Sequence, residues 1–229
     1  MTVIGGCDFE WQATGATSVG MNRRTILISC ILPLLAAAGP TPALSTQDRA
    51  DLARIEVYLN GLRTLKARFL QVAPDGATSE GTAWLQRPGR MRFEYDKPSP
   101  FLMLAGFGSA VFFDAQLKQT TSVPLETTPL SMLLSDTIKL SGDVTVTNVS
   151  RQPGQVQVTL TRTSARGDGT LTLVFADNPL ALRQWSVVDQ QRQETRVSLF
   201  NIEPGGTYPA SLFQFDDPRL VKPTGGPNR

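Results

Sequence analysis

Apolar residues in this chain follow a helical period near residue 50 and an alternating period beyond residue 64. The helical part holds four aliphatic residues at spacings of three and four positions: Leu52, Ile55, Leu59 and Leu62. Charged residues occupy the other faces, residues 45–48 offer side chains for an N-terminal cap, and Gly61 follows the last turn. This pattern predicts one amphipathic helix over residues 47–60.

From residue 64 onward apolar and polar side chains alternate, which is the period of a β-strand. The clearest alternating apolar sets are Leu65, Ala67 and Phe69; Met91, Phe93 and Tyr95; Val156, Val158 and Leu160; and Leu171, Leu173 and Phe175. Further strands are predicted over residues 144–149, 182–189 and 196–202. Turns rich in proline and glycine separate the segments, so we expect an antiparallel meander. Because one face of this sheet is apolar, it must curl around a core.

Residues 128–134 interrupt the strand pattern and predict a short helix, with Thr128 as its N-cap and Pro129 at the first helical position. Four residues make this helix apolar on most sides: Leu130, Met132, Leu133 and Leu134. A helix so apolar must pack onto the open face of the sheet. The predicted fold is therefore mainly β with some α. It is an incomplete, half-open antiparallel β-barrel, with an N-terminal helix and a short apolar lid helix over a hydrophobic cavity.

Residues 21–45 have the features of an export signal. Two arginines precede an apolar run of about 14 residues, which is shorter than the roughly 20 residues that a transmembrane helix needs. Small residues at alternate positions predict cleavage after Ser45, with Ala43 as the alternative. An arginine pair is ordinary in general secretory signals, so we expect that route to the periplasm rather than twin-arginine export. An uncleaved membrane anchor is the competing interpretation.

This signal divides the chain into three expected parts. Residues 1–20 carry Asp8 and Glu10 ahead of the arginine pair, which is unlike a signal peptide, and we interpret them as a non-native extension from a misplaced start site. Residues 21–45 are the signal peptide. Residues 46–229 form a single domain, long enough to bury a substantial core.

Composition narrows the chemistry that the chain can perform. It contains no histidine, and both cysteines, Cys7 and Cys30, lie ahead of the predicted cleavage site. A catalytic residue, a metal site and a cofactor are therefore not expected. A hydrolase that uses a serine or aspartate nucleophile without a histidine base stays open as an alternative. The 22 basic and 20 acidic residues nearly balance, so nothing points to nucleic acid.

Several short segments together are similar to those of a known family. In order they are LKARFLQ at 65–71, GTAWLQRP at 81–88, MRF at 91–93, TPL at 128–130, WSVVD at 185–189 and FQF at 213–215. Their order and spacing resemble the outer-membrane lipoprotein carrier family of the LolA type, over residues 52–215. The resemblance implies a monomeric periplasmic chaperone. Such a chaperone accepts acylated lipoproteins from an inner-membrane ABC transporter and passes them to an outer-membrane receptor lipoprotein or to the outer membrane itself.

The resemblance also assigns roles to individual residues. Arg87 matches the family arginine that hydrogen-bonds toward the lid and couples lid closing to release. The residues expected to line the acyl-chain cavity are Leu65, Ala67, Phe69, Trp84, Met91, Phe93, Phe112 and Phe175. The expected lid residues are Leu130, Met132, Leu133 and Leu134. An ordinary core role fits each cavity residue equally well. The same fold with another cargo, such as a glycolipid, hopanoid or free lipid, or with a sensor function, is the alternative.

Overall fold

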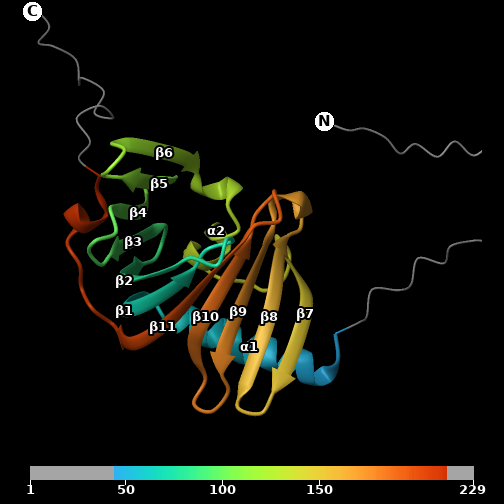
Figure 1. The fold of residues 1–229 in the computed structure, drawn as a ribbon. Coiled ribbons are helices and arrows are strands. Elements are labelled where there is room, and N and C mark those ends of the chain that lie inside the picture. Colours follow the sequence, from blue (N-terminus) through green and yellow to red (C-terminus); the bar gives the residue numbers. More distant parts are fainter. Residues whose placement is uncertain (1–43, 216–229) are drawn as a thin grey trace, which may run out of the picture. The chain divides into compact units, whose positions relative to one another are not determined.

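The computed structural model describes residues 44–215 (Figure 1). The predicted export signal and the residues before it lie outside this described part, apart from Leu44 and Ser45. The helices are α1 (Thr46–Gly61) and α2 (Ser131–Leu134), with 3₁₀ turns η1 (Leu125–Thr127), η2 (Arg166–Asp168) and η3 (Ala210–Phe213). The strands are β1 (Thr64–Val72), β2 (Thr78–Gln86), β3 (Arg90–Tyr95), β4 (Phe101–Gly106), β5 (Ser109–Asp114), β6 (Gln119–Pro124), β7 (Val144–Gln152), β8 (Gln155–Arg162), β9 (Thr170–Ala176), β10 (Ala181–Val188) and β11 (Glu194–Pro204).

Helix α1 confirms the predicted N-terminal helix and extends it by one residue at each end. It begins with a capping box. The Ser45 hydroxyl accepts from the Asp48 N–H, and the Asp48 carboxylate accepts from the Ser45 N–H. Its buried apolar face carries the residues that the sequence pattern selected, Leu52, Ile55 and Leu59.

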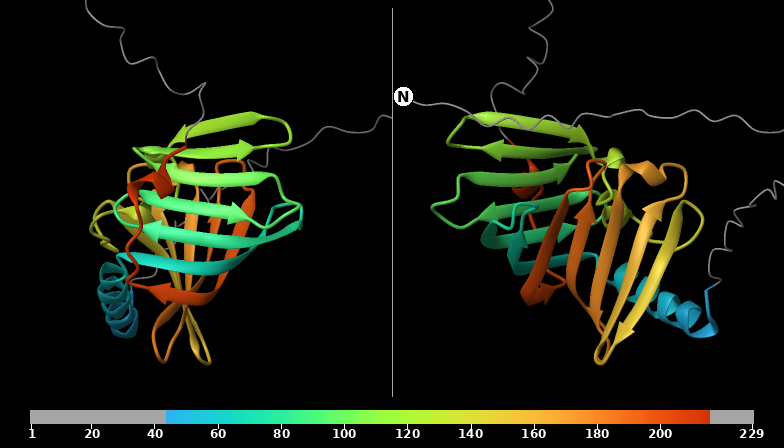
Figure 2. Two further views of the ribbon diagram at one scale, coloured as in Figure 1. Left: turned by 90° about the vertical axis from the view of Figure 1, so that its left-hand side faces the viewer. Right: turned by 45° about the vertical axis from the view of Figure 1, so that its right-hand side comes forward.

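All eleven strands belong to one antiparallel sheet, in the order β6-β5-β4-β3-β2-β1-β11-β10-β9-β8-β7. Consecutive strands are neighbours in the sheet, except for β6 and β7 at its two edges, and β1 pairs with β11 in the middle. The predicted antiparallel meander is therefore confirmed. The sheet is strongly curved, and its β2–β6 part crosses its β7–β10 part steeply (Figure 2). Within residues 44–215 the two edge strands, β6 and β7, do not pair with each other. The barrel is therefore half-open, as predicted.

The core lies on the side of the sheet that faces α1 and α2. Ile55 and Leu59 on α1, Phe69 on β1 and Phe175 on β9 are at most 1% exposed and belong to one cluster. Alternation holds along β1 and β8, where every second residue is buried over most of the strand. In β7 the alternation of Val144 and Val146 shifts because the strand contains a bulge after Val146.

Strands β4, β5 and β6 were not predicted as strands. The sequence of β4, FLMLAG, lacks alternation, and both of its faces are covered, since Leu104 and Ala105 are buried side by side. The outer cover comes from η3, whose Phe213 is 2% exposed and whose backbone runs close to Gly106. Strand β6 is polar and lies at the sheet edge, so it has no buried face to impose a pattern.

Candidate functional site

The curved sheet and the lid enclose a cavity of about 330 Å³. Its wall combines strands from both parts of the sheet with the residues that lead into α2. The lining residues are Gln71, Phe93, Tyr95, Met103, Ala110, Val111, Phe112, Thr121, Val123, Thr128, Leu130, Trp185, Val187, Thr195 and Val197. None of these side chains is a carboxylate, an amine or a guanidinium. A concave, apolar and uncharged wall suits a hydrocarbon ligand.

Aromatic rings of Phe93, Tyr95 and Trp185 form part of the cavity wall. Phe93 is fully buried and meets Trp185 edge-to-face, with ring centroids 6.0 Å apart. Tyr95 has its polar end satisfied, because its hydroxyl donates to the Gln71 side-chain oxygen at 2.9 Å. Burial raises the pKa of Tyr95 to about 12, so the phenol is neutral at any physiological pH. This part of the wall therefore presents uncharged apolar surface throughout.

Two of the eight residues predicted to line the cavity do so in this closed structure, Phe93 and Phe112. Phe112 is 38% exposed and lies toward the outside of the wall. Five others are at most 2% exposed and lie in the closed core: Leu65, Ala67, Phe69, Met91 and Phe175. Their contact with an acyl chain stays a prediction.

The assignment of Trp84 to the cavity needs correction. Strand β2 alternates, and its buried residues are Ala83 and Leu85. Trp84 lies between them on the other face, where its strand neighbours are Lys66 and Arg92. A one-residue change of phase moves a side chain to the opposite side of a sheet, so Trp84 points away from the core.

The lid helix α2 is shorter than the predicted 128–134. Ser131, Met132 and Leu133 donate backbone hydrogen bonds to residues three positions earlier, as in a 3₁₀ turn. Leu134 donates to Leu130, four positions earlier, so the α-helix is a single turn, Ser131–Leu134. Thr128 is not its N-cap, because the Thr128 hydroxyl donates back to the Leu125 carbonyl at 2.8 Å and α2 has no side-chain cap.

The apolar residues of the lid divide between the core and the cavity. Met132, Leu133 and Leu134 are 8%, 3% and 2% exposed and belong to the core cluster. Leu130 lines the cavity. In this closed form the lid therefore fills space that an incoming ligand would need.

Arg87 lies in the turn after β2, is 5% exposed, and connects α1 to the lid. Its Nε donates to the Leu62 carbonyl at 3.1 Å, one Nη to the Leu59 carbonyl, and the other Nη to the Ser135 carbonyl at 3.2 Å. Burial, reinforced by the positive charge of Arg63, lowers the pKa of Arg87 from its usual value. The guanidinium thus binds the end of α1 and the residue that follows α2.

The chain after the lid is tied to α1 and to the Arg87 turn by further hydrogen bonds. They are Gly89 N–H to the Leu134 carbonyl (2.8 Å), the Asn60 side chain to both backbone groups of Ile138 (2.9 Å each), Arg63 to Asp136 (2.7 Å), and the Leu140 N–H to Glu56. The chain that follows the lid is therefore attached to the rest of the protein at several points, and Leu134 is the lid residue among these contacts.

Most of the cavity wall was not identified from the sequence. Trp185 and Val187 on β10 are two residues apart and line the cavity together, as do Thr195 and Val197 on β11. Tyr95 continues the phase of Met91 and Phe93. These residues could have been identified from the sequence, because each lies an even number of positions from an inward-facing residue of the same strand.

The described residues offer no setting for metal chemistry. Within residues 44–215 no group of three or more carboxylate, histidine or cysteine side chains could hold a metal ion. In the same range no helix is long and apolar enough to cross a bilayer. The site geometry is that of a binding pocket with an apolar cover.

The half-open β-barrel and its uncharged, apolar cavity define a protein that can hold an apolar ligand. The family model described as outer membrane lipoprotein carrier protein LolA matches residues 60–216. The chain belongs to this family, which consists of carriers and not of enzymes.

Two carrier proteins that are similar in sequence support this membership. The outer-membrane lipoprotein carrier protein of Methylococcus capsulatus is 30% identical over 200 residues, which cover 83% of this chain and 93% of the relative. That of Pseudomonas fluorescens is 28% identical over 200 residues, with 82% and 93% covered. Among solved structures, a LolA superfamily protein from Nitrosomonas europaea matches with a TM-score of 0.39 and 11% identity, over 72% of this chain and 98% of that one.

Proposed function

We propose that this protein is exported to the periplasm, where it carries lipoproteins between the two membranes. It accepts them from an inner-membrane ABC transporter, holds their acyl chains in the central cavity, and delivers them to the outer membrane or to a receptor lipoprotein there. The observation that carries the proposal is an uncharged apolar cavity beneath an apolar lid that Arg87 contacts, in a chain of the lipoprotein carrier family.

The cavity and the lid compete for the same apolar space. Each methylene group of an acyl chain moved out of water stabilises the complex by about 0.8 kcal/mol. Met132, Leu133 and Leu134 lose burial when the chain displaces them. The net free energy of binding is therefore the gain from burying the acyl chain minus the loss from exposing the lid residues. This difference keeps binding strong enough for transport and weak enough for delivery.

In this proposal Arg87 favours the closed lid and thereby release. Its bond to the Ser135 carbonyl forms only when the end of the lid lies against α1. A hydrogen bond of this kind is worth roughly 0.5–3 kcal/mol. That energy opposes loading and assists delivery by the same amount.

The export signal and its cleavage site form a second part of the proposal. Residues 21–45 direct export, and the carrier domain follows. The structure favours the alternative cleavage after Ala43 over cleavage after Ser45, because Ser45 caps α1 in a capping box. Cleavage after Ser45 would remove this cap and place a positive amino group at the helix N-terminus, where the dipole disfavours it. N-terminal sequencing of protein from the periplasm should begin at Leu44, and a sequence beginning at Thr46 would contradict this preference.

A release assay tests the carrier function. Protein made from the full chain is purified from the periplasm and incubated with spheroplasts that synthesise a labelled outer-membrane lipoprotein. We expect a soluble complex in the supernatant. Ala110→Trp should abolish it by filling the cavity that Ala110 lines, whereas Leu117→Trp, at an exposed position outside the cavity, should not.

Two other outcomes would redirect the proposal. If no lipoprotein is released and mass spectrometry finds a glycolipid, hopanoid or free lipid bound, the fold serves another cargo. If neither lipoprotein nor lipid associates with the protein, the carrier function is wrong.

A further inference from the structure

A second arginine contacts the lid, at the opposite end of the lid from Arg87. Arg162 is the last residue of β8, and its Nη2 donates to the Ser131 hydroxyl at 2.8 Å and to the Thr128 carbonyl at 3.4 Å. The Ser131 hydroxyl in turn donates to the Thr128 carbonyl at 2.8 Å. These bonds join the sheet to the first turn of the lid.

The partners of Arg162 set it apart from the arginines of residues 44–215 that form ion pairs. Six arginines there form ion pairs with carboxylates: Arg54, Arg63, Arg68, Arg92, Arg151 and Arg196. In this range Arg87 and Arg162 donate hydrogen bonds to neutral oxygens alone. Arg162 binds oxygens of Thr128 and Ser131 in the lid, whereas Arg87 binds the carbonyl of Ser135, the residue that follows the lid. Hydrogen bonds from a charged donor are about twice as strong as neutral ones, so the contacts of Arg162 are strong polar contacts for the lid.

The first half of the lid, taken as residues 128–133, is attached to the protein very differently from the second half, which is Leu134 and the residue that follows it. The second half and the residues after it bind α1, Arg63 and the Arg87 turn through several hydrogen bonds. Within the described part of the chain, the hydrogen bonds that residues 128–133 make outside the 125–135 segment all go to Arg162. Thr128 and Leu130, which line the cavity, belong to this first half. Opening the cavity at this end therefore requires the Arg162 contacts to break.

We propose that Arg162 is a positioning residue that latches the first half of the lid over the cavity through the Ser131 hydroxyl. The latch raises the fraction of protein in the closed form. It thereby weakens the apparent affinity for an acyl chain and speeds its release, since apparent affinity falls with the population of the competent state. This inference rests on the proposed function, because it assumes that the cavity holds acyl chains.

The test uses full-chain protein purified from the periplasm, stripped of lipid, with the fluorescent fatty acid cis-parinaric acid as the probe. Ser131→Ala removes the acceptor with little change in volume, and Arg162→Gln removes the charged donor. Each should lower the apparent Kd and slow probe dissociation by roughly ten-fold. Arg162→Lys should restore part of the wild-type value. Arg166→Gln, at an exposed position of η2, is the matched control and should change neither quantity.

The double variant Arg162→Gln/Ser131→Ala separates a latch from a general structural role. If the two side chains act through one contact, the double variant equals the single variants; if they act independently, the effects multiply and the proposal is wrong. A contact that only stabilises the fold would lower the melting temperature and leave the Kd unchanged, which would also overturn it. A wild-type protein that does not bind the probe contradicts the proposed function itself. Normal wild-type binding with unchanged variants contradicts the latch alone.

Discussion

At the scale of single residues, Arg87 joins helix α1 to the end of the lid. Arg87 is buried with three carbonyl acceptors and no carboxylate partner within residues 44–215. Burial of an unpaired charge is costly, and the lowered pKa of Arg87 reflects that cost. The acceptors at Leu59 and Leu62 are carbonyls at the end of α1, where a helix leaves such groups unsatisfied and where its dipole favours a cation. Arg87 therefore satisfies carbonyl groups at the C-terminal end of α1 and also holds the residue that follows the lid.

Replacing Arg87 with leucine should allow loading and impair release. The aliphatic side chain cannot hold Ser135 in the closed position, so the loaded form gains relative to the closed form. The variant should also lose about 1–3 kcal/mol of stability, because buried carbonyls at the end of α1 lose their donor. The measurement is the fraction of bound lipoprotein that passes to outer-membrane vesicles. Arg90→Leu in the neighbouring strand is the control, and efficient transfer by Arg87→Leu would refute the coupling.

The two tryptophans after the predicted cleavage site lie on opposite faces of the sheet, which provides a direct optical test of the cavity. Trp185 lines the cavity, whereas Trp84 lies on the outer face. A fatty acid brominated along its chain should quench most of the Trp185 fluorescence on binding, since bromine quenches at contact range. Trp84→Phe should keep this quenching and Trp185→Phe should lose it. Equal quenching in both variants would mean that the chain binds elsewhere.

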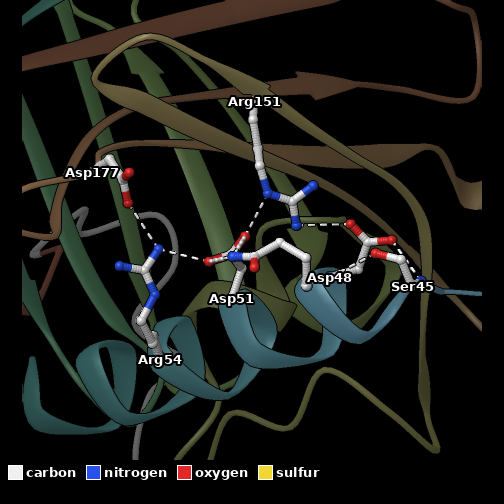
Figure 3. Close-up of polar contacts among 7 residues, drawn as sticks. Ser45, Asp48, Asp51, Arg54, Arg151 and Asp177 are labelled. Carbon is white, nitrogen blue, oxygen red and sulfur yellow. Dashed lines mark hydrogen bonds and ion pairs between the residues drawn. The ribbon is translucent and has the colours of Figure 1, made fainter.

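At the scale of elements, α1 is fastened at both ends. A network of charged side chains holds its N-terminal half (Figure 3). Asp51 accepts hydrogen bonds from Arg151 at 2.6 Å and Arg54 at 2.7 Å, and Asp48 accepts from Arg151 at 2.8 Å. Arg54 also reaches Asp177, in the turn after β9. The C-terminal end accepts from Arg87. A fixed α1 gives the lid a rigid surface to close against.

This network predicts acid sensitivity of the fold. Hydrogen bonds from Ser45 and Arg151 lower the pKa of Asp48 to about 2. Burial alone would raise the pKa of Asp51, but hydrogen bonds from Arg151, Arg54 and Gln47 outweigh it and lower that pKa. Both folded values lie below the ordinary value of about 3.9. The stabilisation is therefore complete above pH of about 4 and is lost as the pH falls toward about 2.

Asp51→Asn should reduce the free energy of unfolding at pH 7 by about 1–3 kcal/mol, because two arginines lose their carboxylate partner. Urea unfolding at pH 7 and pH 3 measures the effect. The wild type should lose more stability between these pH values than Asp51→Asn does. Asp143→Asn, at an exposed position, should behave as the wild type. Parallel losses in the wild type and Asp51→Asn would contradict the assignment.

The sequence predicted those helices and strands that bury one face and expose the other. Helix α1 and strands β1, β3 and β8 bury one side over most of their length, so their apolar period is visible. Strand β4 is covered on both sides, by the core and by η3, and β6 is exposed at the edge, so neither shows alternation. The contacts of Arg162 with the lid could not be predicted, because residues 31 positions apart meet only through the sheet topology.

For the whole molecule, the size of the cavity sets the length of chain that can bind before the lid moves. A methylene group is about as large as a water molecule, whose share of liquid volume is about 30 Å³. The closed cavity of about 330 Å³ therefore holds roughly ten methylene groups. A longer acyl chain would extend beyond the space that the lid leaves free. We therefore expect longer chains to enlarge the cavity by moving the lid, whose first residues are held to the sheet through Arg162.

A series of fatty acids of increasing length should reveal this enlargement as a change of slope. Up to roughly ten carbons, each added methylene should tighten binding about four-fold, the equivalent of about 0.8 kcal/mol. Longer chains should gain less at the length where they displace Leu130 and Met132, whose burial is then lost. From that length onward, hydrogen exchange should rise at the amides of Ser131, Met132 and Leu133, which bond within the lid.

The amide of Gly89, which bonds to Leu134 beside the Arg87 contact, should begin to exchange faster only with still longer chains, which displace the second half of the lid as well. Strand amides of β8 and β9 serve as the internal control, since their ladder does not involve the lid. A constant slope through the whole series, with no rise in exchange at the lid, would mean that the chains enter without moving it. In that case the closed structure would already be the loaded one. The competition between lid and cargo, on which release depends, would then not exist.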